Sequence, residues 1–187
     1  MDEEAIDRIR SLPQVHVLDE AHALEHSLEV HLPFLQQVLG DPSTGSGQVP
    51  STSLPPSPEL LWTGRTSFTI VPLVIGNAAD EEIREALEIL WGGPETRIVV
   101  SSDLSHYHDY ETAKKRDRAT SDAIEAFRAE KIGFEDACGR LPIQGLLHVA
   151  HQHGLRARTV DLRNSGDTAG PRDRVVGYGA YVFTQDH

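Results

Sequence analysis

The amino-acid sequence predicts an α/β fold, a three-layer α/β/α arrangement with a mostly buried central sheet. Apolar residues recur at helical spacing in several segments, which is typical of helices with one face against a core. Between these segments lie short runs rich in β-branched and aromatic residues, which favour strands. The alternation of the two patterns indicates a sheet covered by helices on both faces. In open sheets of this class, ligands bind beyond the carboxyl ends of strands.

Four helices are expected where apolar residues repeat every three or four positions. Pro142 suits the first turn of the last one, where no N–H is needed, and Gly154 suits its end. The start of the first helix stays open, because Pro33 would kink a helix that begins near Ser27 but would fall in the first turn of one that begins near His31. The repeating residues are Leu28, Leu32, Leu35 and Leu39, then Ile83, Ala86, Leu87 and Leu90, then Ala119, Ala123 and Phe127, then Ile143, Leu146, Leu147 and Ala150.

Strands are expected at residues 68–76, 97–102, 156–162 and 175–183. Residues 40–67 interrupt the alternation, since they are dense in Pro, Gly, Ser and Thr. Such a segment buries too little apolar surface to offset the entropy lost on ordering. We therefore expect one domain over residues 1–187, with a disordered insertion at 40–67.

The composition excludes several classes of partner and location. Seventeen Lys and Arg against 29 Asp and Glu give a formal net charge of -12, which disfavours binding to nucleic acid or to an anionic membrane. The single cysteine, Cys138, cannot form an intrachain disulfide, which fits a reducing compartment. No apolar run approaches the roughly 20 residues of a spanning helix. A cytoplasmic location is expected.

The stretch "VVSSDLSHYHDY", residues 99–110, passes from an apolar run directly into carboxylates and imidazoles. The small side chain of Ser102 lets the backbone approach a ligand, Asp103 can hold a metal or orient an imidazole, and His106 can transfer protons near neutral pH. The alternative is that Asp103 caps a turn while the histidines are solvated. The spacing by itself leaves both interpretations open.

Three further segments offer reactive groups, each with a structural alternative. In "EHSLEVHLPFL", His31 follows His26 by five positions, not the four of a zincin helix, so a local capping network is favoured over a metal site. Cys138 stands just ahead of the helix that Pro142 opens, where a thiolate could bind a metal or attack an electrophile, although most buried cysteines are inert. Asn164 lies in a glycine-bearing segment that either walls a pocket or forms a simple turn.

Taken together and in this order, "EHSLEVHLPFLQ", "IVPLVIG", "VVSSDLSHY", "ACGRLPIQGLL" and "LRNSGDTAG" followed by "VVGYGAYVF" resemble the Memo-like family, known in prokaryotes as AmmeMemoRadiSam system protein B. The resemblance covers nearly the whole sequence except residues 40–67. That family is similar to the catalytic subunits of class III extradiol dioxygenases. The resemblance therefore implies a dioxygenase-subunit-like α/β/α fold around a pocket which, in the dioxygenases, holds non-haem iron(II).

The resemblance also assigns expected roles to individual residues. Cys138 stands where the dioxygenases carry their third metal ligand, a carboxylate. Asp103 and His106 would form the catalytic pair in the pocket, with His106 the best candidate for proton transfer. The other residues expected at the pocket are Glu25 and His26 of the family's "EHS" motif, His31, Ser102 and Asn164.

One departure from the family pattern affects the metal. Family members carry "PHAGY" and "GPSH" segments upstream, whose histidines supply the other two metal ligands, and neither segment occurs in this sequence. The sequence is therefore expected to hold the C-terminal portion of the domain, N-terminally incomplete, with an exposed sheet edge and an open pocket wall. Iron(II), with copper or zinc as alternatives, is expected in the complete domain, and tight binding to this chain alone is not expected.

The function expected from the resemblance is that of a metal-binding, dioxygenase-like oxidoreductase, inactive alone and acting on a small molecule whose identity stays open. The alternative is a non-catalytic binding module that partners radical SAM and AMMECR-type proteins. A third possibility is hydrolysis with Cys138 as nucleophile and His106 as base, which requires the two side chains to lie within hydrogen-bond reach.

Overall fold

A computed structural model of the chain describes residues 1–39, 68–168 and 170–185. The chain divides into two compact units. The first comprises Met1–Asp7 and Leu18–Val74, and the second comprises Arg8–Val17 and Ile75–His187. The insertion expected at 40–67 lies outside the described residues.

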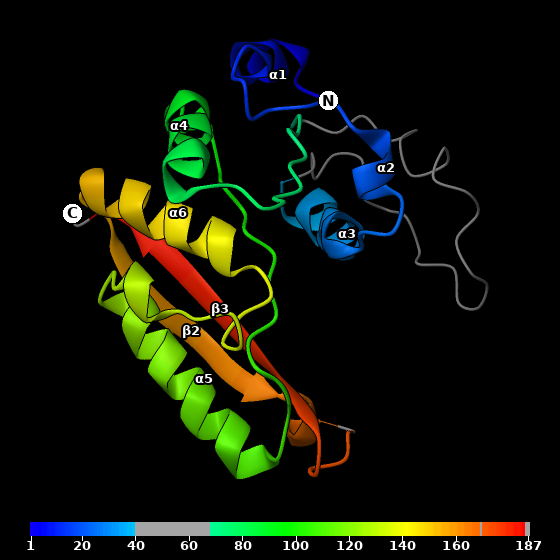
Figure 1. Cartoon of the computed structure of the whole chain (residues 1–187), viewed down its shortest axis with the longest axis vertical. Helices are drawn as coiled ribbons and strands as arrows, with labels where there is room; N and C mark the ends of the chain where they lie inside the picture. The colour runs from blue at the N-terminus through cyan, green and yellow to red at the C-terminus, as the bar shows by residue number, and fades with distance from the viewer. Residues whose placement is uncertain (40–67, 169, 186–187) are drawn as a thin grey trace. The chain divides into compact units, whose positions relative to one another are not determined.

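Helices α1 (Glu3–Arg10), α2 (Asp19–His22) and α3 (Ser27–Leu39) account for the secondary structure before residue 40 (Figure 1). Within the first unit, the Asp2 N–H donates to the Ile70 carbonyl oxygen at 3.0 Å, and Thr69 Oγ1 donates to Asp2 Oδ2 at 2.9 Å. These bonds fasten Asp2 to residues 69 and 70. Because α3 begins at Ser27, Pro33 lies inside the helix rather than in its first turn.

The second unit contains an antiparallel sheet in the order β1-β3-β2, formed by β1 (His106–His108), β2 (Arg156–Asn164) and β3 (Val175–Thr184). The last two confirm the strands expected from the sequence. In the described residues, 68–76 and 97–102 form no strand. Pro72 lacks the N–H that a central strand needs, which accounts for part of this difference.

Helices α4 (Asp80–Leu90), α5 (Tyr110–Glu125) and α6 (Arg140–Gln152) belong to the same unit and occur where the apolar periodicity predicts them. The short 3-10 turns η3 (Ala129–Lys131) and η4 (Ser165–Asp167) follow α5 and β2. As predicted, Pro142 falls in the first turn of α6, and Gly154, with φ of +69°, follows its end. None of the helices in the described ranges is long and apolar enough to cross a membrane.

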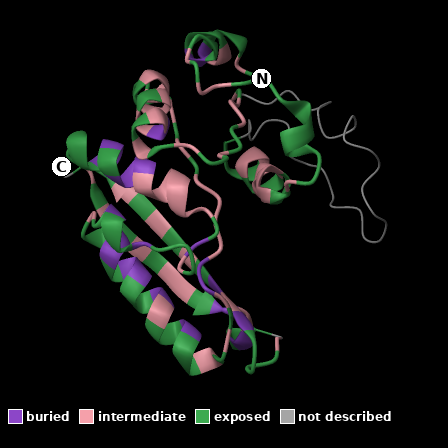
Figure 2. Cartoon of the chain, viewed as in Figure 1, coloured by how far each residue is buried: buried purple, intermediate pink, exposed green. Residues whose placement is uncertain are grey.

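The core of the second unit lies between α5, α6 and one face of the sheet (Figure 2). Ile124 of α5 and Leu147 of α6 are each 1% exposed and pack with Phe183 of β3. The α/β class is thereby confirmed. One feature differs from the expectation of a mostly buried sheet, because exposed and half-buried residues alternate along β2 and β3. In the described part of the chain, the helices cover one face, and the opposite face exposes Val160, Tyr178 and Val182.

Candidate metal centre

The segment from Asp103 to His106 is attached to β3, the middle strand of the sheet, by backbone hydrogen bonds. The Leu104 N–H donates to the Gly177 carbonyl at 2.9 Å, and the Gly177 N–H donates to the Ser105 carbonyl at 2.8 Å. The chain then bulges at Tyr107, whose φ is +62°, and the pairing register with β3 shifts between His106 and His108. A positive φ is uncommon for a bulky residue, so this bulge marks a strained backbone next to His106.

Cys138 approaches this segment from the loop that precedes α6. Its N–H donates to the Asp103 carbonyl at 3.3 Å, and the Gly139 N–H donates to Ser102 Oγ at 2.8 Å. The two backbones come so close that a Cβ added to Gly139 would lie 2.8 Å from the Ser102 Cβ. Glycine at 139 therefore lets the loop that carries Cys138 rest directly on the segment that carries Asp103.

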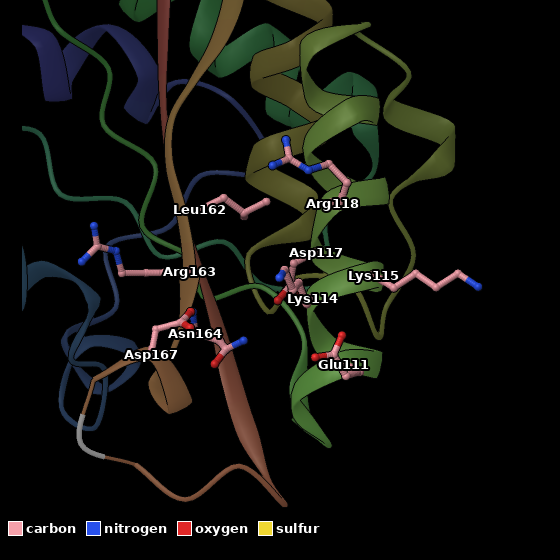
Figure 3. A pocket seen from close by; sticks show the side chains of 9 residues that line it. All are labelled: Glu111, Lys114, Lys115, Asp117, Arg118, Leu162, Arg163, Asn164 and Asp167. Carbon is pink, nitrogen blue, oxygen red and sulfur yellow. The ribbon is translucent and has the colours of Figure 1, made fainter.

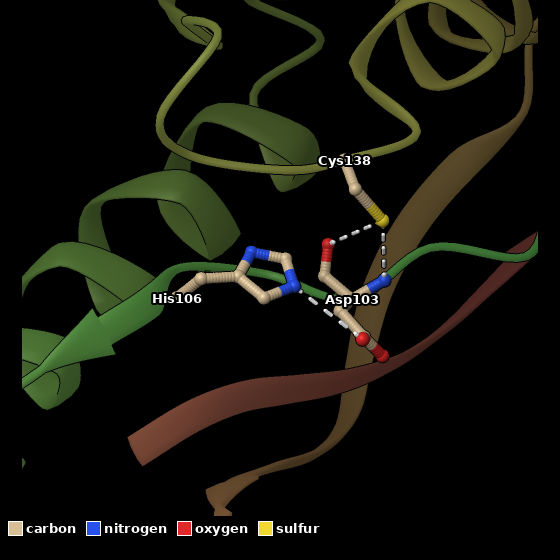
Figure 4. Close-up of side chains that lie close together, drawn as sticks. All are labelled: Asp103, His106 and Cys138. Carbon is tan, nitrogen blue, oxygen red and sulfur yellow. Dashed lines mark hydrogen bonds and ion pairs between the residues drawn. The ribbon is translucent and has the colours of Figure 1, made fainter. Parts of the chain in front are cut away.

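Asp103, His106 and Cys138 bring their donor atoms together at this junction (Figure 4). One oxygen, one ring nitrogen and the sulfur all lie within 4.8 Å of one another. His106 Nε2 is 3.5 Å from Asp103 Oδ2, and the Asp103 N–H donates to Cys138 Sγ at 3.2 Å. The Asp103 side chain is 48% exposed and that of His106 is 32% exposed, so the group is open to solvent.

This donor set fits a transition-metal ion. Two donors bound to one ion at roughly 2.0 to 2.3 Å lie at most about 4.6 Å apart, so small side-chain rotations would bring the group to coordination distance. Thiolate and imidazole ligands favour iron, copper or zinc over magnesium or calcium. Three protein donors also leave coordination positions for further ligands.

The hydrogen bonds at the sulfur bear on the hydrolase alternative. Cys138 Sγ accepts from the Asp103 N–H, and it lies 3.6 Å from Ser102 Oγ. Within the part of the chain that the structure describes, no hydrogen bond joins the sulfur to His106, whose recorded ion pair is with Asp103. The sulfur is therefore held by the backbone N–H and carbonyl of Asp103 rather than in a hydrogen-bonded Cys–His pair.

Ser102 and Asn164, both expected at the pocket, have different surroundings. Ser102 lies at the donor group, where its Oγ contacts Cys138 and also donates to the Asp103 carbonyl at 2.7 Å. Asn164 is 2% exposed at the end of β2, and its Oδ1 accepts the Gly166 N–H at 2.9 Å to cap η4. It lines a hollow of about 360 Å³ between α5 and β2, and the three donors of the candidate centre are not among the residues that line it (Figure 3).

Glu25, His26 and His31 belong to the first unit, at the start of α3. Glu25 Oε1 accepts the Ser27 N–H at 2.8 Å, and this hydrogen bond lowers the pKa of the Glu25 carboxyl. His26 Nδ1 lies 3.2 Å from Glu29 Oε2, with both side chains largely exposed. His31 is half-buried on α3. The local capping network predicted for this segment is therefore present at the helix start.

Sequence reasoning missed Asp117. This residue is 2% exposed on the inward face of α5, and its Oδ1 accepts the Ser105 N–H at 3.0 Å. Burial raises the pKa of the Asp117 carboxyl. The signal was available in the sequence, because Asp117 interrupts the helical repeat of small and apolar residues that includes Ala113 and Ile124.

Comparison with known proteins identifies the family. The family described as "Memo-like protein" matches residues 1–182. The chain belongs to the Memo-like family. The resemblance inferred from the motifs is thus confirmed, and its relation to extradiol dioxygenases is consistent with that family.

Several curated relatives share similarity over nearly all of this Memo-like chain. A MEMO1 family protein of Saccharolobus islandicus is 33% identical over 98% of the chain and 60% of its own length. The corresponding protein of Ignicoccus hospitalis is 30% identical over 97% of the chain and 60% of its own length. That of Aquifex aeolicus is 29% identical, covering 98% and 63%. The Memo-like chain thus spans about three fifths of the length of these relatives.

Proposed function

We propose that this Memo-like chain carries the thiolate side of a transition-metal centre of dioxygenase-like type. Cys138 is the metal ligand, and Asp103 with His106 forms the catalytic pair beside it. Iron(II) is the proposed metal, with copper or zinc as alternatives. The proposal is supported by one observation, the approach of carboxylate, imidazole and thiol donors to within 4.8 Å although Cys138 is 35 residues from Asp103.

Each side chain contributes a distinct property. The Asp103 N–H donates to the sulfur of Cys138, which fixes the position of this sulfur beside the Asp103–His106 segment. The Asp103 carboxylate lies 3.5 Å from His106 Nε2, which orients the ring. A bound metal would supply Lewis-acid and redox chemistry toward a small-molecule substrate. His106 would then move a proton to or from that substrate.

The proposal also predicts weak metal binding by this chain alone. In the family resemblance the other two ligands are histidines of "PHAGY" and "GPSH" segments, which this sequence does not contain. The group formed by Asp103, His106 and Cys138 gives few bonds to the ion without those histidines. The activity, substrate and partners proposed for a whole Memo-like protein therefore have to be tested on a chain that contains those segments.

Cobalt(II) titration tests the proposal, because the only thiol in the sequence is Cys138 and a thiolate-to-cobalt absorption band can come from no other residue. We expect the band in the parent protein and its loss in Cys138→Ser. His106→Ala should weaken the affinity by about tenfold, as for loss of a group at a metal site. His148→Ala on α6, outside the donor group, serves as the matched control. A parent protein without the band at saturating cobalt would contradict the proposal.

A second candidate function is a non-catalytic binding module, with radical SAM and AMMECR-type proteins as the proposed partners. It is supported by apolar side chains on the outer face of the sheet, where Val160 is 54% exposed, Tyr178 43% and Val182 37%. Co-purification with each partner, repeated with Val160→Asp, tests this role. Recovery of neither partner by the parent protein would count against it.

The proposed location is the cytoplasm, because the single cysteine is free and forms no disulfide that would require an oxidising compartment. Cell fractionation with an antibody against the protein tests the location. Recovery of the protein outside the cytoplasmic fraction would contradict it.

A further inference from the structure

Asp117 connects α5 to the segment that carries two of the metal-centre residues. Its carboxylate is 2% exposed, and Oδ1 accepts the backbone N–H of Ser105 at 3.0 Å. Ser105 lies between Asp103 and His106 in the chain, so this bond acts on the peptide that joins them. Burying a carboxylate costs stability unless it makes specific hydrogen bonds. The hydrogen bond to Ser105 is therefore the interaction that offsets part of the cost of burying Asp117.

The same residue, Ser105, is also held by β3. The Ser105 carbonyl accepts the Gly177 N–H at 2.8 Å, so one backbone group of Ser105 is bonded to α5 and the other to β3. Gly177 also makes room for the carboxylate, because a Cβ at this position would clash with Asp117 Oδ2. Asp117 and Gly177 thus act as a matched pair around Ser105.

A shift of Ser105 would also displace the backbone of Asp103, which is hydrogen-bonded to Cys138. Asp103 both donates its N–H to Cys138 Sγ and accepts the Cys138 N–H. The orientation of Ser105 therefore controls the backbone groups that face Cys138 as well as the side chain of His106 one residue later. The Asp103 and His106 side chains themselves are 48% and 32% exposed, and Asp103 Oδ2 lies 3.5 Å from His106 Nε2.

We propose that Asp117 is a positioning residue of the metal centre, which holds the Asp103–His106 segment at the separation from Cys138 that metal binding requires. The inference rests on the proposed function of the donor group. It adds a residue that touches none of the donors and acts through the backbone of Ser105. A buried carboxylate that is retained for positioning, despite its cost in stability, is expected next to functional sites.

The central comparison is between Asp117→Ala, which removes the acceptor, and Asp117→Asn, which keeps an oxygen acceptor for the Ser105 N–H. The matched control is Asp122→Ala, an exposed aspartate on the same helix. Cobalt(II) affinity is measured from the Cys138 thiolate band, the alkylation rate of Cys138 by iodoacetamide is measured without metal, and urea unfolding is followed in parallel. We expect Asp117→Ala to weaken cobalt binding by about tenfold and to change the alkylation rate. Asp117→Asn and Asp122→Ala should behave as the parent.

Gly177→Ala provides an independent variant in which the carboxylate is intact but displaced. It should reproduce the defect of Asp117→Ala in both cobalt affinity and alkylation rate. Combining the two substitutions should be no worse than either alone, because the alanine methyl then occupies space left by the missing carboxylate. If Asp117→Ala does not fold, the comparison of Gly177→Ala with Asp117→Asn still tests whether Asp117 positions the metal centre.

Several outcomes would overturn the inference. Parent-like cobalt affinity and alkylation in Asp117→Ala, with only the urea midpoint lowered, would show that Asp117 stabilises the fold without positioning the site. An equal defect in Asp117→Asn would show that charge matters rather than the hydrogen bond to Ser105. If the parent itself shows no thiolate-to-cobalt band, the proposed function fails, and the alkylation rates alone confirm or refute the positioning role.

Discussion

Gly139 lies where the loop that carries Cys138 rests on the segment that carries Asp103, and its replacement by alanine tests whether this contact assembles the site. An added Cβ would lie 2.8 Å from the Ser102 Cβ and 2.9 Å from the Ser101 carbonyl oxygen. Ordinary contacts of such a carbon begin at 3.4 Å. The two segments must therefore separate by roughly half an ångström, since one of the two obstacles is backbone.

The expected cost follows from this separation. Overpacking of this size costs about 1–3 kcal/mol. The separation also stretches the bond from the Gly139 N–H to Ser102 Oγ, now 2.8 Å, and that from the Cys138 N–H to the Asp103 carbonyl, now 3.3 Å. We expect Gly139→Ala to lower the free energy of unfolding by about 2 kcal/mol, which shifts the urea midpoint by roughly 1 M. Cobalt affinity should fall with it, and Cys138 should be alkylated faster.

Urea unfolding, cobalt titration and alkylation of Cys138 are the assays. Gly76→Ala is the matched control, because nothing lies within 4 Å of a Cβ added there. Adding Ser102→Gly to Gly139→Ala should recover part of the loss, since the Ser102 side chain is then absent while the Ser101 carbonyl remains. Parent-like unfolding, cobalt binding and alkylation in Gly139→Ala would refute the reasoning that this contact sets the site.

Three other outcomes are expected. Leu147→Ala should lower the free energy of unfolding by about 2–5 kcal/mol in urea, because Leu147 is 1% exposed in the core, and a loss under 1 kcal/mol would show that this cluster does not carry the fold. The hydrogen bond from Tyr110 OH, at 2.6 Å, lowers the pKa of Asp167, so its stabilisation is present above about pH 4 and is lost as the pH falls through the folded pKa. Tyr110→Phe should therefore be less stable than the parent at neutral pH, with the difference shrinking on acidification in pH-dependent urea unfolding; a constant difference would contradict this. Asn164→Ala should lose about 1 kcal/mol of stability with its cap, yet leave the alkylation rate of Cys138 unchanged, whereas a changed rate would place Asn164 at the site after all.

The helices were predictable because their signal is local. The apolar repeats on α4 and α6 each mark one buried or half-buried helix face, and the structure places helices there as well as over the leucine repeat at 28–39 and at Ala119 and Ala123 of α5. Pro142 and Gly154 marked the ends of α6 for equally local reasons, a missing N–H and a positive φ. Neighbours a few residues apart decide such features, so no distant contact had to be known.

The strands were predictable only in part, because a strand depends on its partner. The run at 175–183 pairs with 156–162, and both are strands. The equally apolar runs at 68–76 and 97–102 have no ladder partner in the described residues and form no strand there. The exposed outer face of the sheet was missed for the same reason, since β propensity reports a fit to a pleated surface and not what covers that surface.

The sequence by itself determined the helix faces, the chemistry of the available donors and the family, because these depend on residue types and on their order along the chain. The meeting of Cys138 with Asp103, 35 residues apart, depends on a loop contact that only glycine at 139 permits. The burial of Asp117 against Ser105 and Gly177 likewise requires α5 to be docked on β3. Only the tertiary structure could decide these features, because hydrogen bonds between distant segments exist only once the segments are packed together.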